Sequence, residues 1–151
     1  MPDAALSFRP ATREDVPAVL ALLADDVLGQ GRESPDPAPY HAAFDAMQAE
    51  GGNVLYVGEA GGRVVATYQL TLISGLSLSA ARRAQIEAVR VDAGLRGQGA
   101  GAALMADAEA RARAGGARLI QLTSNASRKD AHRFYERLGY APSHIGFKKP
   151  L

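Results

Sequence analysis

The chain has 151 residues and a mass of 15.8 kDa, which suits one domain around a single core; its 47% hydrophobic and 22% charged residues exclude a wholly disordered or fibrous chain. Cysteine is absent, which excludes disulfide scaffolds, cysteine-ligated metal sites and thiol nucleophiles. The formal net charge is +1, the basic residues are scattered, and the nine aromatic residues are few for stacking bases, so we expect no nucleic-acid partner.

The amino-terminal third predicts one strand and two helices. Residues 6–9 alternate as a strand does, and Thr12 followed by Asp15 has the pattern of a helix start with a capping acid. Apolar residues then recur at helical spacing: Val16, Val19, Leu20, Leu22, Leu23 and Val27. A loop over residues 29–39 precedes a second helix, which ends at Gly51.

The middle of the chain predicts a hairpin and one further strand. The expected strands are residues 54–57, 64–73 and 85–91, with the turn of the hairpin at Gly61 and Gly62. Residues 74–83 are rich in serine and small residues and predict a loop.

Beyond residue 91 helices and strands are expected to alternate. The expected order is a glycine-rich loop at 92–101, a helix at 102–114, a strand at 119–123, a helix at 128–138, and a final strand pair around Tyr140 and residues 145–148. This order predicts a mixed α/β sandwich and a single domain over residues 1–151.

The glycine-rich loop joins a strand to the start of a helix. Such a helix end presents unsatisfied N–H groups and a positive dipole, and Gly99 and Gly101 let the backbone approach a pyrophosphate. A Rossmann dinucleotide loop would also match Gly97-x-Gly99-x-x-Ala102. However, that motif needs an acid about 20 residues on, where this chain has Thr123-Ser124-Asn125. The Walker pattern is absent as well.

Residues 96–101, Arg-Gly-Gln-Gly-Ala-Gly, fit the pattern Arg/Gln-x-x-Gly-x-Gly/Ala at every specified position. With Val89-Arg90-Val91 before them and residues 131–140 after them, the chain resembles the GCN5-related N-acetyltransferase (GNAT) superfamily. The resemblance implies the family's α/β (α+β) fold. That fold has a central mixed, mostly antiparallel sheet with splayed fourth and fifth strands, flanked by four helices.

The resemblance also implies acetyl-CoA as the cosubstrate. The residues that match the family's cofactor-binding positions are Val89, Arg90, Val91, Arg96, Gly97, Gln98, Gly99, Ala100, Gly101 and Asn125. The loop amides would hold the pyrophosphate, the strand at 89–91 would pair with the pantetheine arm, and Asn125 would hydrogen-bond that arm from the other side.

Two residues match the family's positions for proton transfer. Glu87 would be the general base, on a strand face that alternation predicts it to share with Gln85 and Val89. Tyr135, four residues before Gly139, would be the general acid for the departing thiolate. The three histidines lack ligand spacing, so we expect no metal, and a packing or capping role is expected for His132.

The acceptor is less sharply defined. In this superfamily its pocket usually involves segments that correspond to residues 28–44 and 74–83. The first segment and its flank carry Asp25, Asp26, Glu33 and Asp36, which favours a cationic amine. Arg32, Arg82 and Arg83 could instead hold a carboxylate or phosphonate on a zwitterionic substrate. The carboxyl-terminal part is similar to aminoalkylphosphonate N-acetyltransferases.

We therefore expect an acyltransferase acting on a small-molecule primary amine. A protein amino terminus or lysine side chain is the alternative acceptor, and a non-catalytic acetyl-CoA sensor is the alternative function. The uncharged stretch 64–81 is interrupted by polar residues and the start of the chain lacks a signal-peptide pattern, so we expect a cytoplasmic protein without a membrane partner. The resemblance leaves a homodimer open.

Overall fold

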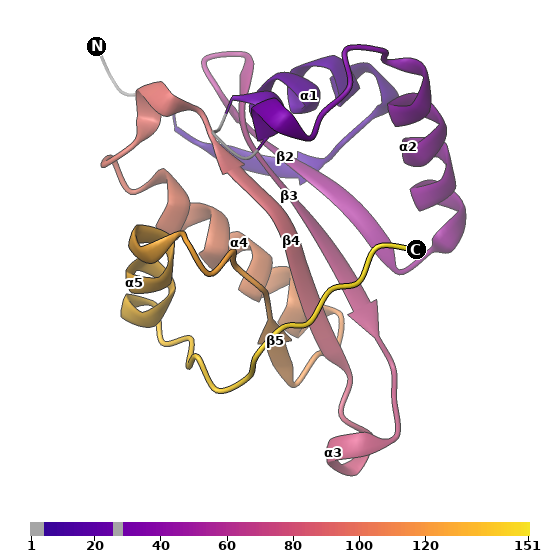
Figure 1. The fold of residues 1–151 in the computed structure, drawn as a ribbon, viewed down its shortest axis with the longest axis vertical. Helices are drawn as coiled ribbons and strands as arrows, with labels where there is room; N and C mark the ends of the chain where they lie inside the picture. Colours follow the sequence, from indigo (N-terminus) through magenta and orange to yellow (C-terminus); the bar gives the residue numbers. More distant parts are fainter. Residues whose placement is uncertain (1–4, 26–28) are drawn as a thin grey trace. The chain divides into compact units, whose positions relative to one another are not determined.

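The computed structural model describes residues 5–25 and 29–151 (Figure 1). The chain divides between Gln121 and Leu122 into two compact units, which are described separately. Three residues named above, Asp26, Val27 and Leu28, lie outside the described residues. No helix in the described ranges is long and apolar enough to span a membrane.

The first unit is built on a five-stranded sheet. Its strands are β1 (Ser7–Pro10), β2 (Asn53–Ala60), β3 (Arg63–Ile73), β4 (Arg83–Val91) and β5 (Leu119–Gln121), in that spatial order. Neighbours are antiparallel except β4 and β5, which are parallel. The predicted mixed, mostly antiparallel sheet is confirmed. β5 pairs only with Arg83–Gln85, so the rest of β4 has no partner in β5.

Helices and single helical turns lie in the connections between the strands. In the first unit they are η1 (Arg13–Asp15), α1 (Val16–Ala24), η2 (Gly29–Gly31), α2 (Ala38–Glu50), α3 (Ser77–Ala80), η3 (Ala93–Leu95) and α4 (Ala100–Ala114). The second unit contains α5 (Lys129–Arg137). Most bounds differ from the predicted ones by one to three residues, as expected for helix ends that fray.

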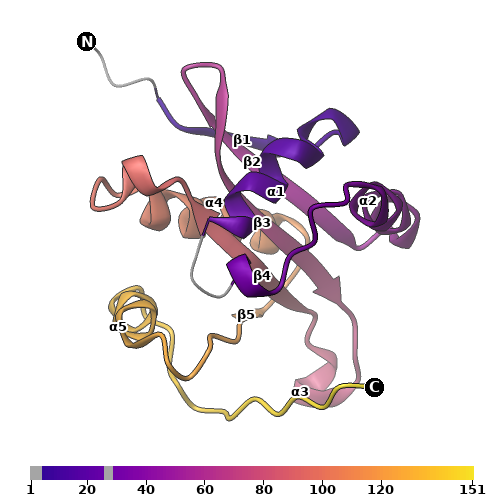
Figure 2. The same cartoon turned by 45° about the horizontal axis from the view of Figure 1, so that its top comes forward.

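The two faces of the sheet pack on different helices. One face packs on α4: the hydroxyl of Tyr68 hydrogen-bonds Asp107, and Arg111 lies over the ring of Tyr56. Burial raises the pKa of Tyr68, and the bond to Asp107 adds to this. The other face packs on α1 and α2 (Figure 2) through a cluster of buried residues: Ala11, Val16, Val19, Phe44 and Val57.

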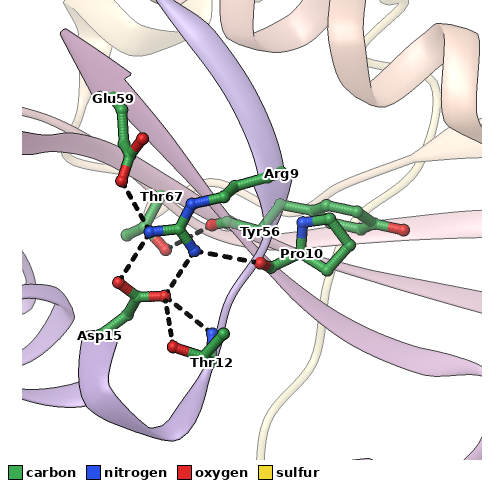
Figure 3. Close-up of polar contacts among 7 residues, drawn as sticks. All are labelled: Arg9, Pro10, Thr12, Asp15, Tyr56, Glu59 and Thr67. Carbon is green, nitrogen blue, oxygen red and sulfur yellow. Dashed lines mark hydrogen bonds and ion pairs between the residues drawn. The ribbon is translucent and has the colours of Figure 1, made fainter. Parts of the chain in front are cut away.

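Arg9 on β1 is the centre of an ionic network at the start of this second face (Figure 3). Its guanidinium donates to both carboxylate oxygens of Asp15, at 2.7 and 3.0 Å, and to Glu59 at 2.7 Å. Asp15 also accepts the Thr12 amide at 2.7 Å, and the predicted capping box is present. The network therefore ties β1 and β2 to the turn that begins α1.

We expect Asp15→Asn to lower the free energy of unfolding by about 1–3 kcal/mol, because it weakens a charge-assisted hydrogen-bond network around a buried side chain. The Arg9 guanidinium holds the pKa of Asp15 below its usual value. The contribution of Asp15 to the free energy of unfolding is therefore complete above the ordinary aspartate pKa of about 3.9. It is lost as the pH falls through the lower pKa that Asp15 has in the folded protein. Urea titrations of the wild type and of Asp15→Asn from pH 7 to pH 2 measure the difference in the free energy of unfolding. A stability difference that does not shrink at low pH would contradict it.

The second unit corrects one expectation. Residues 138–151 contain no strand, although alternation predicted a pair around Tyr140 and at 145–148. Ile145 and Phe147 do alternate, but they are 82% and 91% exposed. A strand exists only with a hydrogen-bonded neighbour, and residues 122–151 supply none within their own unit. Pro142 and Pro150 also remove two backbone donors.

The tip of the β3–β4 hairpin was predicted as a loop and forms the single turn α3 instead, at the lower end of Figure 1. Leu78, Ser79 and Ala80 have φ values of 54°, 59° and 59°. Three successive non-glycine residues in the left-handed region are unfavourable, by about 1–2 kcal/mol each. Leu76, just before the turn, is 93% exposed.

Candidate functional site

Strand β4 carries a bulge at the predicted site. Glu87 pairs with Gln69, and Arg90 pairs with Thr67. Two residues of β4, Ala88 and Val89, therefore lie opposite one residue of β3, Tyr68. Ala88 has a φ of 52°, a backbone conformation that alanine seldom adopts. A bulge leaves backbone groups out of the ladder and bends the strand. Here the carbonyl of Val89 accepts a hydrogen bond from the guanidinium of Arg90 at 2.9 Å.

The bulge corrects the expected face of β4. Gln69 and Thr67 lie on one face of β3, so their partners Glu87 and Arg90 share a face of β4. Gln85 lies on this face too, whereas Val91 pairs with Ala66 on the α4 side. The expectation that Val89 continues the face of Gln85 and Glu87 was wrong because it assumed unbroken alternation. Glu87 itself is exposed to solvent.

The loop after β4 prepares the start of α4. Asp92 Oδ1 accepts the amide of Gly94 at 2.8 Å and starts the turn η3. Gly97 and Gly99 follow with φ values of 77° and 80°, and Gly99 is the N-cap of the 15-residue helix α4. Both glycines adopt a backbone conformation that other residues rarely reach. This is why the sequence needs glycine there.

The same loop has the properties of an anion cradle. A Cβ placed on Gly97 or Gly99 would meet no heavy atom within 4 Å, so the space beside the backbone is open. The first amides of α4, from Ala100 onward, have no acceptor within the helix, and the helix dipole is positive there. Arg96 is exposed, and Gln98 donates back to the Gly94 carbonyl at 3.0 Å. The loop therefore fits a pyrophosphate group.

Gly99→Val is expected to raise the dissociation constant for CoA about tenfold or more, because its side chain would enter the open space of the cradle. Gly62→Val is the matched control: Gly62 has a φ of 75° with open space around it, but lies in the β2–β3 turn. Both variants carry the same kind of backbone strain, so calorimetric titration with CoA separates strain from occlusion. Equal CoA affinity in the two variants would contradict the assignment of the loop.

The remaining predicted residues lie in the second unit. Asn125 Oδ1 accepts the amide and the hydroxyl of Ser127, at 2.9 and 2.7 Å, so this oxygen holds the turn before α5. His132 Nε2 donates to the Asn125 carbonyl at 2.8 Å, consistent with its expected capping role. Only the amide nitrogen of Asn125, a donor, is not used in these bonds.

Tyr135 lies on α5 and is partly buried. Its ring makes edge contacts with Phe134 and Tyr140, with centroids 5.2 and 6.0 Å apart. These contacts hold the ring of Tyr135 in one orientation. Substitution of the hydroxyl alone should therefore leave the packing of α5 intact.

Two carboxylates of the segment before α2 already make hydrogen bonds to nearby residues of the chain. Glu33 accepts the hydroxyl of Tyr40 at 2.7 Å, which raises the pKa of Tyr40, and Asp36 accepts the Ala38 amide at 3.0 Å. Both carboxylates have local structural roles. The argument for a cationic acceptor from these acids is correspondingly weaker.

A band of polar side chains crosses the face of Glu87 and was not identified from the sequence. Cross-strand pairing aligns Asn53, Thr71, Gln85 and Gln121, one on each of four strands. Asn53 Oδ1 accepts from Gln69 at 2.8 Å, and Gln85 Oε1 accepts from Gln121 at 2.7 Å. The polar residues at every second position of β3 were a signal that this face is not wholly core.

Known proteins resemble this chain in sequence and in fold. The family model described as "Acetyltransferase (GNAT) family" matches residues 17–140. An aminoalkylphosphonate N-acetyltransferase of Salmonella typhimurium is 53% identical over 57 residues, which are 38% of this chain; the match spans 37% of that relative's length.

Solved structures match over nearly the whole chain. A transcriptional regulator from Bacillus halodurans has a TM-score of 0.93 at 40% identity, covering 97% of this chain and 100% of that one. A putative acetyltransferase from Agrobacterium tumefaciens has a TM-score of 0.86 at 28% identity, covering 96% and 99%.

Proposed function

The chain belongs to the acetyltransferase (GNAT) family, an acyltransferase family that uses acetyl-CoA, and we propose that it transfers the acetyl group to the primary amine of a small molecule. The observation that carries the proposal is the anion cradle at the start of α4, directly after the bulged strand that bears Glu87. As part of the proposal, the chain acts as one N-acetyltransferase domain in the cytoplasm.

The cofactor contacts follow from the chain's own backbone. The amides of Gly97 and of residues 99–101 would bind the pyrophosphate of acetyl-CoA, with the side chains of Arg96 and Gln98 at its edge. The backbone of residues 89–91, which lie beyond the part of β4 that pairs with β5, would pair with the pantetheine arm, and Asn125 would donate to that arm through its amide nitrogen. Acetyl-CoA supplies a thioester carbonyl that an amine can attack.

Glu87 has the role of general base. An amine with a pKa near 10 is free base in about one part in a thousand at neutral pH, which amounts to about 4 kcal/mol. Glu87 takes the proton from the ammonium group, directly or through one water. Its exposed position beside the bulge lets an acceptor reach it from solvent.

Tyr135 has the role of general acid. Negative charge builds on the sulfur as the C–S bond breaks, and a phenol with an ordinary pKa of about 10 is protonated at neutral pH and can donate its proton toward that sulfur. The ring contacts with Phe134 and Tyr140 would keep the hydroxyl in place during transfer.

A second candidate is a non-catalytic acetyl-CoA sensor. The Bacillus halodurans relative is called a transcriptional regulator, which favours this candidate. The presence of both Glu87 and Tyr135 favours the enzyme.

Release of CoA thiol decides between the two functions. The chain is incubated with acetyl-CoA and a panel of small amines and lysine peptides, and free thiol is followed with time. The enzyme releases thiol in proportion to an acetylated product, and a small amine should exceed every peptide in kcat/KM. Tight CoA binding without release for any acceptor would favour the sensor.

A further inference from the structure

We infer that the acceptor carries an anionic group, a carboxylate or a phosphonate, in addition to its amine, and that Arg83 on β4 binds this group. The inference rests on the proposed function and specifies its substrate class. The amine lies at Glu87, and the anion lies further along the same face of the same strand.

Strand geometry places the two charges at a useful separation. Arg83, Gln85 and Glu87 alternate regularly before the bulge and lie on one face, since their partners Ile73, Thr71 and Gln69 alternate too. At about 3.3 Å per residue, the Cα atoms of Arg83 and Glu87 are about 13 Å apart. The two side chains can lean toward each other over Gln85. The interval suits a short zwitterion with its amine and its acid at opposite ends.

Arg83 is a cation without a compensating anion. It is partly buried, its Nε atom is fully buried without a hydrogen-bond partner, and no described carboxylate lies within the 4.0 Å of an ion pair. Two other partly buried arginines do have an anionic partner, Arg9 on β1 and Arg111 on α4. Arg9 binds Asp15 and Glu59, and Arg111 binds Asp107.

The absence of an anion beside Arg83 among the described residues favours an external partner. Withdrawing a guanidinium from water is costly unless an anion or hydrogen-bond acceptor replaces the water. A carboxylate or phosphonate matches the planar donor fork of arginine with two parallel hydrogen bonds. A bound acceptor would supply the missing acceptor atoms.

The polar band completes the site between the two charges. Gln85 lies midway, hydrogen-bonded to Gln121, and Thr71 pairs with Gln85 across the strands. A primary amide offers two donors and an acceptor oxygen, so these groups retain hydrogen-bonding capacity beyond the bond they make. Neutral polar side chains repel neither end of a zwitterion.

The test compares acceptors that differ only in the distal group. Thiol release is measured with unbranched ω-amino carboxylates, ω-aminoalkylphosphonates and amino alcohols of equal chain length. We expect wild-type kcat/KM to be about tenfold or more higher for an anionic acceptor than for the matched alcohol, which corresponds to one hydrogen-bonded charge pair. The carboxylate and phosphonate series show which anion the site prefers.

Variants assign the preference to Arg83. Arg83→Met should bring the ratio of kcat/KM between anionic and neutral acceptors close to one, and Arg83→Lys should keep part of it. Arg63→Met is the matched control, because Arg63 is 74% exposed at the β2–β3 turn; it should keep the full ratio. Alkylphosphonates and alkyl carboxylates without an amine should compete with the acceptor in the wild type, a readout that does not depend on a variant folding.

The failures are distinguishable. Equal kcat/KM for anionic and neutral amines, a preference that survives in folded Arg83→Met, or no competition by amine-free anions would overturn the inference and leave the proposed function standing. No thiol release with any acceptor would overturn the proposed function, and the inference with it.

Discussion

Glu87→Gln should lower kcat about 100-fold or more at neutral pH, because the amide keeps the size and hydrogen bonding of the carboxylate but cannot accept the proton of the acceptor. Affinity for CoA should hardly change, since the anion cradle lies at the start of α4 and does not include Glu87. The defect should shrink as pH rises toward the pKa of the amine, because the acceptor then arrives as free base. Steady-state rates from pH 6 to pH 10 measure this.

Glu109→Gln is the matched control, since it removes one carboxylate from α4, which packs on the opposite face of the sheet. It should keep wild-type rates across the pH range. A defect in Glu87→Gln that is independent of pH would indicate positioning instead of proton transfer. Wild-type rates in Glu87→Gln would exclude Glu87 from the mechanism.

Tyr135→Phe should reduce kcat about 100-fold while acetyl-CoA affinity and thermal stability stay near those of the wild type. The substitution removes one oxygen, and the ring contacts with Phe134 and Tyr140 remain. A thioester with a more acidic thiol needs less help to leave, so the defect should be smaller with such an analogue. Glu87→Gln should not be rescued in this way.

Tyr140→Phe is the control for Tyr135→Phe, because it removes the hydroxyl of the ring that packs against Tyr135. It should retain its rate with natural acetyl-CoA. Equal rescue of the Glu87 and Tyr135 variants by the analogue would show that the two residues do not divide the proton transfers as proposed. Full activity of Tyr135→Phe would leave Tyr135 as a packing residue.

The sequence predicted the conformation of the glycine-rich loop well because its local rules are strict. Gly97 and Gly99 occupy positions with positive φ, and residues 100–114 follow as a helix, which began two residues earlier than expected. Strands β2 to β4 and the helix α2 also follow from alternation and glycine stops. At these elements local preference and tertiary packing favour the same structure.

The bulge and the left-handed turn could not be predicted in this way. Ala88 adopts a positive φ without being glycine, and Val89-Arg90-Val91 alternates as a regular strand does. Leu78 and Ser79 likewise give no sign of a left-handed turn. In both places the long-range pairing of β3 with β4 overrides local preference. The polar band was missed for the same reason, since it exists only once four strands are aligned.

The cradle at the start of α4 has a consequence for how such a chain evolves. Main-chain N–H groups are present whatever the side chains are, so most substitutions along residues 96–101 keep the donors proposed to bind phosphate, provided that Gly97 and Gly99 keep their backbone conformation. The proposed acceptor site is made of side chains, and one substitution at Arg83 or Gln85 would change its chemistry. Substitutions can therefore change which acceptor is bound, while the binding of the cofactor is kept.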